Sequence, residues 1–455
     1  LPEWLAPIVI AMAAAGLLAL SVAAHDHRLA KGALGFLIAA IAALAVTIET
    51  TAELSRLYEA AVVPHPARAV LRWSVLSLVT AAFAWRNVGS ALRFALQPLA
   101  ALLGYGLFAQ IVPAPWLAVA TSAALAVLVE AGRRRPAFAL EPVLTTLGAV
   151  LVLWAVEPFG YWLVAGVKSL GASPVFYTEL PSSSVAIGRL LVPAIAVALT
   201  LWRASRHLPG NIRNAAVMLT AGGALIGVHI LYKQVFLIGD SAAFVQRGLA
   251  ERCLWEALLL SAGALAWRYG VGRPLAIGLI AASVAHNLVY TIGLHDPLWS
   301  EQAVGGWPLL NLLLPAFGTS FAAVALLNRI VPSCPVYLTR AGEGLRMAMI
   351  LLFAFATWRQ LFSGTILPFG EVTGAENIGR SVLAILLAID FLLWGIRHGL
   401  RDWRLASLVL MLGAAIKVFL FDASGLEGLL RIVSFLALGF SLIGIGWLHN
   451  RYRQS

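Results

Sequence analysis

The sequence predicts an all-α, polytopic transmembrane helical bundle of about 15 spans, and two observations carry that prediction. Hydrophobic residues make up 61% of the chain and charged residues only 12%, with a mean hydropathy of +0.88. Soluble domains carry roughly twice that share of charge. Apolar windows of about 18 to 22 residues recur along the whole chain, and each is long enough to cross a bilayer. Because hydrocarbon offers the backbone no hydrogen-bond partners, the windows are expected to be helices.

Taken in order along the chain, the expected spans lie at 4–24, 33–52, 69–86, 94–112, 115–131, 141–158, 186–203, 212–236, 247–268, 273–294, 308–330, 344–363, 377–397, 403–421 and 427–448. Arginine and lysine gather at every second connection, and acids gather in the connections between. Basic connections stay on the cytoplasmic side of a membrane. We therefore expect the C-terminus to be cytoplasmic, and the odd number of spans then puts the N-terminus outside. The net charge of +11 then reflects orientation and contact with membrane lipids, so no nucleic-acid partner is expected.

Several landmarks recur at a common offset, which predicts an internal repeat. Trp85-Arg86 and Trp267-Arg268 end two spans that lie about 180 residues apart, and Ile187-Gly188-Arg189 and Ile378-Gly379-Arg380 open two others about 190 apart. Six spans separate the copies, so the copies share one orientation and form parallel repeats. The predicted organisation is a leading span and joint at 1–32, repeat 1 at 33–203, repeat 2 at 204–401 and a partial third repeat at 402–455.

Three outer connections share one charged template. A helix ends in a cation followed within three residues by Phe, a loop containing Gly follows, and an acid opens the next helix. The Lys233 joint contains Lys233, Gln234, Asp240, Glu251 and Arg252; the Arg359 joint contains Arg359, Gln360, Glu376 and Arg380; the Lys417 joint contains Lys417, Asp422, Glu427 and Arg431. Arginine is the residue that binds phosphate and carboxylate in a bidentate manner, so a converging set would suit an anionic headgroup. The alternative is that these charges only anchor and cap helix ends.

Four polar residues lie within apolar runs: Asp390, Glu256, His229 and His286. A charge at the bilayer centre costs about 2.5–3.5 kcal/mol on insertion scales, so such a residue is expected to face a polar cavity or a partner. They are candidates for proton coupling. The alternative for Asp390 is a protonated, hydrogen-bonded carboxyl, and the alternative for each histidine is an interior hydrogen bond between helices.

An enzyme would need a catalytic group at a membrane face, and the early outer loop offers Glu49 and Glu53. Either carboxylate would be the candidate base of a membrane-embedded transferase that uses a lipid-linked donor. The two cysteines, Cys253 and Cys334, fall near opposite faces of the membrane. No metal site and no cofactor are predicted.

The segment AAIKVFLFDASGLEGLLRIVSFLALGFSLIGIGWLHNR near the C-terminus resembles the closing part of a bacterial membrane-protein family, domain of unknown function 2339. The matching residues are Lys417, Val418, Phe419, Asp422, Arg431, Ser434, Phe435 and Gly439. The resemblance implies an array of spans in the inner membrane and does not indicate a substrate.

Three functions fit these observations. The first is transport or flipping of an anionic lipid, glycan or small solute through a site at the outer face. The second is the transferase described above. The third is a non-catalytic scaffold for an envelope complex, in which the repeats supply packing surface for a protein partner. A transporter predicts a mid-membrane cavity lined by Asp390, Glu256 or His286.

Overall fold

The computed structural model describes residues 2–47, 50–87, 89–204 and 210–418, together with 436, 439–440 and 443–444. Throughout this part of the chain the regular structure is helical, apart from one isolated β-bridge between Ala303 and Ile366. Each expected span from 4–24 to 403–421 coincides with a helix, and twelve of the described helices are long and apolar enough to cross a membrane. The predicted all-helical multi-pass fold is confirmed. The span expected at 427–448 lies almost wholly outside the described residues.

The chain divides into two compact units. Unit 1 comprises Leu1–Gly166 and Phe176–Leu237, and unit 2 comprises Val167–Val175 and Ile238–Ser455. This division follows packing, and it does not coincide with the predicted repeat boundaries at 203/204 and 401/402. The six-span repeat stays a prediction.

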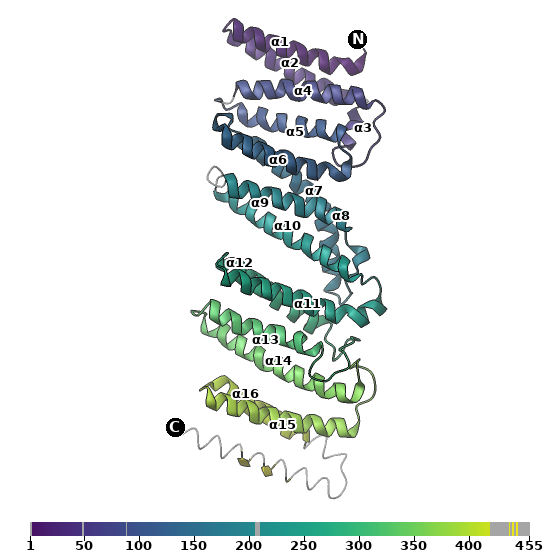
Figure 1. Ribbon diagram of the computed structural model, residues 1–455, viewed down its shortest axis with the longest axis vertical. Helices are drawn as coiled ribbons and strands as arrows, with labels where there is room; N and C mark the ends of the chain where they lie inside the picture. Colours follow the sequence, from purple (N-terminus) through teal and green to yellow (C-terminus); the bar gives the residue numbers. More distant parts are fainter. Residues whose placement is uncertain are drawn as a thin grey trace. The chain divides into compact units, whose positions relative to one another are not determined.

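In unit 1, helices that follow one another in the chain lie side by side (Figure 1). Its helices are α1 (Ala6–Ala23), α2 (His27–Val46), α3 (Thr50–Ser55), α4 (Pro66–Arg86), α5 (Arg93–Ile111), α6 (Leu117–Arg134), most of α7 (Glu141–Ser169), α8 (Ser183–Ala186), η5 (Ile187–Leu191), α9 (Val192–Ala204) and α10 (Gly210–Phe236). The contact between α1 and α2 buries Ala11, Ala14, Ala33 and Ala40 completely. Small side chains let helices approach closely, which gives van der Waals contact where lipid supplies no hydrophobic driving force.

Unit 2 repeats this side-by-side packing of helices (Figure 1). Its helices are α11 (Ser241–Arg268), α12 (Arg273–His286), η7 (Asn287–Leu294), α13 (Leu313–Ile330), α14 (Val336–Ser363), α15 (Gly374–Arg397) and α16 (Arg401–Lys417). The helices α11, α12 and α13 contact one another, as do α14, α15 and α16. α11 has 28 residues but is not among the twelve helices with a span-like composition, because its first half is rich in charge.

Short polar residues start several of these helices. The Asp240 side chain accepts a hydrogen bond from the Ala243 amide (2.8 Å) and caps α11. Thr373 accepts from the Glu376 amide (3.2 Å) and caps α15, with the Glu376 carboxylate in the first turn. A side-chain oxygen at this position satisfies one of the free amides of the helix start. Of the residues in the predicted charged joints, Asp240 therefore has a capping role.

Candidate functional site

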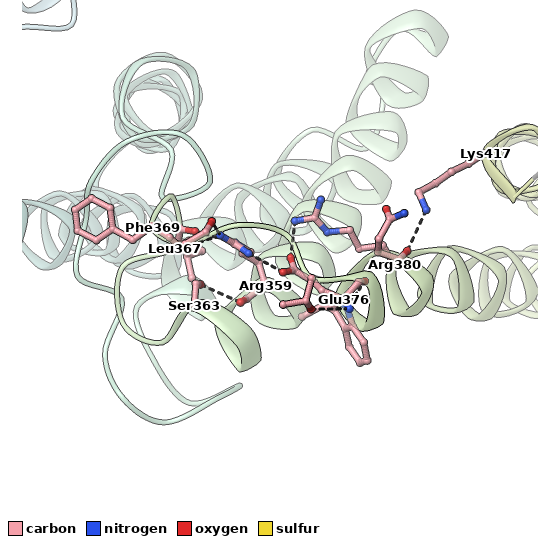
Figure 2. Close-up of polar contacts among 11 residues, drawn as sticks. Arg359, Ser363, Leu367, Phe369, Glu376, Arg380 and Lys417 are labelled. Carbon is pink, nitrogen blue, oxygen red and sulfur yellow. Dashed lines mark hydrogen bonds and ion pairs between the residues drawn. The ribbon is translucent and has the colours of Figure 1, made fainter. Parts of the chain in front are cut away.

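Arg359, near the end of α14, is the centre of a buried polar cluster in unit 2 (Figure 2). Its guanidinium donates from Nε to the Leu367 carbonyl (2.9 Å) and from Nη2 to the carbonyls of Phe369 and Gly370 (2.7 Å each). Nη1 donates to Glu376 Oε2 (2.6 Å). The loop between α14 and α15 therefore wraps around the guanidinium. A guanidinium has five N–H groups, and four hydrogen bonds leave little of it for a ligand.

The Glu376 carboxylate is completely buried and lies between two arginines. Besides Arg359, it accepts a hydrogen bond from Arg380 Nη2 (2.6 Å), one helical turn further along α15. The Trp358 indole donates to the Glu376 carbonyl (3.1 Å) and covers Gly379. A Cβ at Gly379 would lie 1.9 Å from Trp358 Cζ2, so glycine is needed for this close approach. Glu376 and Arg380 are four residues apart in the sequence, so they lie on one face of α15.

Lys417 brings the Lys417 joint to the same helix. Its Nζ donates to the Asn377 carbonyl (3.0 Å) and to Ser381 Oγ (2.6 Å), both in the first turns of α15 (Figure 2). Two of the three charged joints therefore meet at the start of α15. Asp422, Glu427 and Arg431 lie outside the described residues.

Gln360 connects the Arg359 joint to a second loop, residues 295–312, called loop 295–312 below. Its amide donates to the Gly305 carbonyl (2.7 Å), and its carbonyl oxygen accepts from Asn311 Nδ2 (2.6 Å). The Val304 amide donates to the Thr365 carbonyl (2.9 Å), which joins the two loops through their backbones. Gln360 therefore acts here as a support for backbone.

The Lys233 joint is divided between the two units, with Lys233 and Gln234 in unit 1 and the rest in unit 2. Gln234 donates its amide to the carbonyls of Tyr177 (3.4 Å) and Pro181 (3.0 Å), as Gln360 does to Gly305. Lys233 and Glu251 are both buried. The role of these three residues in binding a substrate stays a prediction.

Arg252 is completely buried within unit 2 and differs from Arg359 in its partners. Its Nη2 donates to Gln302 Oε1 (2.9 Å) and, at 3.5 Å, to the His295 carbonyl, so both acceptors lie on loop 295–312. The ring centroids of Phe244 and Tyr290 lie 5.0 and 5.7 Å from its Cζ. Within the described part of the chain, its Nε and Nη1 have no hydrogen-bond partner, and it makes no ion pair. A buried donor left unpaired costs about 1–3 kcal/mol, and more when it is charged.

Asp296 follows His295 on loop 295–312 and, like Arg252, is completely buried. Its Oδ1 accepts from the Leu298 amide (2.8 Å), and its Oδ2 has no partner among the described residues. Burial disfavours the charged form and raises the pKa of this carboxyl to about 6.

Glu256 lies one turn beyond Arg252 on α11 and is completely buried. Its carboxylate accepts from Asn287 Nδ2 (2.7 Å) and from the Thr291 hydroxyl, and it lies 2.8 Å from His286 Nδ1. The Ser283 hydroxyl donates to the Glu256 carbonyl (2.8 Å). Among the described residues, no arginine or lysine pairs with this carboxylate. In the part of the chain that the structure describes, His286 is its one partner with a basic side chain, and that side chain is 24% exposed.

The partners of Glu256 are placed by a π-helical segment. η7 (Asn287–Leu294) continues α12 directly, and it carries Asn287 and Thr291. Asn287 also donates to the Ala316 carbonyl (2.8 Å) and accepts from Ser320, which ties the cluster to α13. π-helical turns are rare and frequently occur at functional sites.

The other intramembrane candidates have different surroundings. Asp390 is exposed on α15 and contributes to no described cluster. His229 Nδ1 accepts a hydrogen bond from the Trp162 indole (2.9 Å), which matches the alternative of an interior bond between helices. The cavity described in unit 1 is lined by residues other than these. A mid-membrane cavity at Asp390, Glu256 or His286 stays a prediction.

The transferase candidate Glu53 is completely buried in unit 1. It forms an ion pair with Arg72 and accepts from the Trp73 indole (2.8 Å), while Gln110 donates to its backbone carbonyl (3.1 Å). Its carboxylate is therefore enclosed by partners of the chain itself. Glu49 lies outside the described residues.

Sequence reasoning missed several partners in these clusters, and only some left a signal. Arg72 is a charge inside an apolar run, which should have marked it for a buried partner. The remaining missed residues are uncharged or lie in loops, and no pattern distinguishes them: Gln302, Asp296, Thr291 and Ser320. In the described residues, no group of three or more His, Cys, Asp or Glu side chains is arranged to hold a metal ion.

Comparison with known families supplies the wider context for these clusters. The model of a family described as a predicted membrane protein, DUF2339, matches residues 3–452. The chain belongs to this family. The search of curated proteins and the search of solved structures each found no match. The family assignment agrees with the resemblance of the C-terminal segment and extends it to nearly the whole chain.

Proposed function

We propose that this membrane protein transports an anionic solute or the anionic headgroup of a lipid or glycan, with proton coupling inside unit 2. Arg252 would contact the anion, and the Glu256–His286 pair would exchange the proton. The observation that carries the proposal is Arg252, a completely buried guanidinium with two unpartnered nitrogens and no ion pair within the described residues. The proposal places loop 295–312 at the outer face of a bacterial inner membrane, in line with the distribution of arginines.

The case for an anion at Arg252 is electrostatic. Taking a charge out of water costs several kcal/mol unless it is paired and hydrogen-bonded. Gln302 and the His295 carbonyl satisfy only Nη2, and the two flanking rings supply cation–π attraction without an opposite charge. A carboxylate or phosphate oxygen at Nε and Nη1 would complete the guanidinium in its bidentate geometry.

The case for a proton at Glu256 rests on its neutral partners. Asn287 and Thr291 donate hydrogen bonds without bringing charge, and the His286 imidazole, 2.8 Å from the carboxylate, is a group that can accept or release a proton. A proton can therefore reside on the carboxylate or on the imidazole without breaking an arginine ion pair. The partly exposed His286 side chain offers the proton a way in.

The spacing of the two groups links anion and proton. Arg252 and Glu256 are four residues apart on α11, which puts them on one helix face about 6 Å apart along the axis. An anion bound at Arg252 favours protonation of groups nearby, and a proton there favours the anion by the same factor. Such reciprocity supports transport of anion and proton in the same direction.

The test is anion-dependent proton movement in proteoliposomes with an internal pH-sensitive dye. Inorganic phosphate and acetate serve as the probe anions. We expect wild-type protein to acidify the lumen when either anion is added outside, and we expect Arg252→Gln and Glu256→Gln to lose at least tenfold in rate. Arg268→Gln, at the exposed far end of α11, and Glu371→Gln, an exposed acid, are the matched controls.

Two results would contradict the proposal. Wild-type vesicles that match empty vesicles for both anions would favour the scaffold hypothesis. Equal rates in wild type and Arg252→Gln would remove the anion site from Arg252. Binding gives a second measure, since phosphate should raise the unfolding temperature of the wild type and not of Arg252→Gln.

A further inference from the structure

We propose that unit 1 contains a phospholipid site, in which one acyl chain occupies an elongated apolar cavity and the lipid phosphate contacts Arg189. The site lies wholly within unit 1 and does not depend on the transport proposed for unit 2. Arg189 belongs to the Ile187-Gly188-Arg189 motif, which so far has no assigned role.

The cavity has a volume of about 590 Å³ and lies among α7, α9 and α10. Its lining is apolar except for three threonines and Arg189. Along η5 and α9 it extends from Leu190 to Leu201, which at 1.5 Å per residue is about 16 Å. A long narrow space of this kind fits an extended hydrocarbon chain better than a compact solute. Water is a poor occupant, because an apolar lining provides few hydrogen-bond partners.

Two glycines show that the space is open on both sides. Gly148 of α7 and Gly223 of α10 line the cavity, and a Cβ added at either position meets no heavy atom within 4 Å. One turn further along α10 the packing is tight, since a Cβ at Gly227 would lie 2.8 Å from Leu191 Cδ2. The open space at Gly223 therefore ends before Gly227.

Arg189 is the one charged residue that lines the cavity, and it lies in the π-helical segment η5. Its guanidinium stacks over the Trp154 ring (4.6 Å) and forms an ion pair with Glu157, whose side chain is 58% exposed. Within the described residues, Glu157 is its one ion-pair partner, so other N–H groups of the fork remain for a second anion. The side chain is 16% exposed and thus accessible from the end of the cavity. Arginine next to an apolar channel matches a phosphate joined to an acyl chain.

The experiment uses the full chain reconstituted with a phospholipid that carries a photoreactive diazirine in one acyl chain. After illumination, mass spectrometry locates labelled peptides. We expect labelling of α7, α9 and α10 peptides around Gly148, Leu201 and Gly223. Gly223→Leu should reduce that labelling at least fivefold, while Gly222→Leu, next to it on α10 and also with open space at its Cβ, should keep it.

A second pair of variants repeats the test on α7, with Gly148→Leu against Gly160→Leu, and size-exclusion chromatography confirms that each variant is folded. Arg189→Gln should weaken retention of the phospholipid about tenfold through detergent washing, and Arg189→Lys should retain more of it than Gln does. A diazirine fatty acid is the competing probe.

Labelling that is equal in both folded leucine variants and wild type would overturn the acyl-chain site. Labelling by the fatty acid that exceeds labelling by the phospholipid, with no effect of Arg189→Gln, would overturn the phosphate contact. Labelling that spreads over all lipid-facing helices alike would reduce the site to ordinary lipid contact and overturn it as well.

Discussion

Arg359 and Arg252 are both buried arginines of unit 2, yet their surroundings are opposite. Arg359 donates four hydrogen bonds to its own chain, and one of them goes to the Glu376 carboxylate. Arg252 has only loop acceptors for one nitrogen and no carboxylate partner among the described residues. In unit 1, Arg72 resembles Arg359 in one respect, because it pairs with a buried carboxylate, that of Glu53. A buried arginine is therefore no indicator of function in itself, and the difference between these arginines is whether the chain itself supplies a carboxylate partner.

The largest expected loss of stability follows from removing the Arg359 clamp, by which we mean the Arg359 guanidinium with its hydrogen bonds to Glu376 and the loop carbonyls. Arg359→Met would leave the buried Glu376 with only Arg380 and remove the support of three loop carbonyls. Breaking a buried pair on one side costs about 3–5 kcal/mol. Unfolding in detergent should show this loss. Arg397→Met, an arginine at the other end of α15, is the control, and an equal change in both would contradict the clamp.

Ionisation of Asp296 is expected to lower the free energy of unfolding by about 3 kcal/mol. Its pKa is raised to about 6 in the folded protein from 3.8, and each pKa unit corresponds to 1.36 kcal/mol. The sign follows from proton binding, because the folded state holds this proton more tightly than the unfolded state does. This contribution to stability is therefore complete below pH 3.8, is lost as pH rises to about 6, and stays lost above.

Asp296→Asn removes that titration while keeping an oxygen for the Leu298 amide. We expect the variant to be more stable than wild type at pH 7.5 and nearly equal to it near pH 4. Unfolding temperatures at both values measure the difference. A constant offset between the two proteins across this range would show that Asp296 keeps its usual pKa.

A loss of about 1–3 kcal/mol is expected for Gly379→Ala, because overpacking forces neighbouring side chains to move. The new Cβ would overlap the Trp358 ring and disturb the indole bond to the Glu376 carbonyl. Near-ultraviolet circular dichroism and unfolding temperature report the ring and the stability. Gly374→Ala, whose Cβ meets nothing within 4 Å, should leave the tryptophan signal unchanged.

The smallest expected effect is that of Arg252→Met, and it tests the comparison directly. The variant loses the bond to Gln302 but also the cost of a buried, partly unpaired charge, so stability should change by less than about 1 kcal/mol. A loss as large as that of Arg359→Met would show that Arg252 is also a clamp.

The sequence predicts the helices well because length and hydropathy decide them, as the agreement from α1 to α16 shows. It also predicts neighbours on one helix, such as Glu376 and Arg380. It cannot predict which face of a helix meets a partner, and Asp390, expected to face a cavity or partner, is exposed. The hydrogen bonds of Arg252 depend on His295 and Gln302, which lie 43 and 50 residues further along the chain. No local sequence pattern encodes such contacts.

The charge of α11 has a consequence for how the chain enters the membrane. Arg252 and Glu256 each add about 2.5–3.5 kcal/mol to insertion of an isolated helix, and α11 lacks the composition of a span. α12 and η7 follow closely and carry the groups that neutralise or hydrogen-bond Glu256. Insertion of α11 and α12 together, as a hairpin in which Glu256 already has its hydrogen-bond partners, reduces the Glu256 share of that cost. The cluster around Glu256 would then form during biogenesis, before α13 adds the carbonyl of Ala316 and the hydroxyl of Ser320.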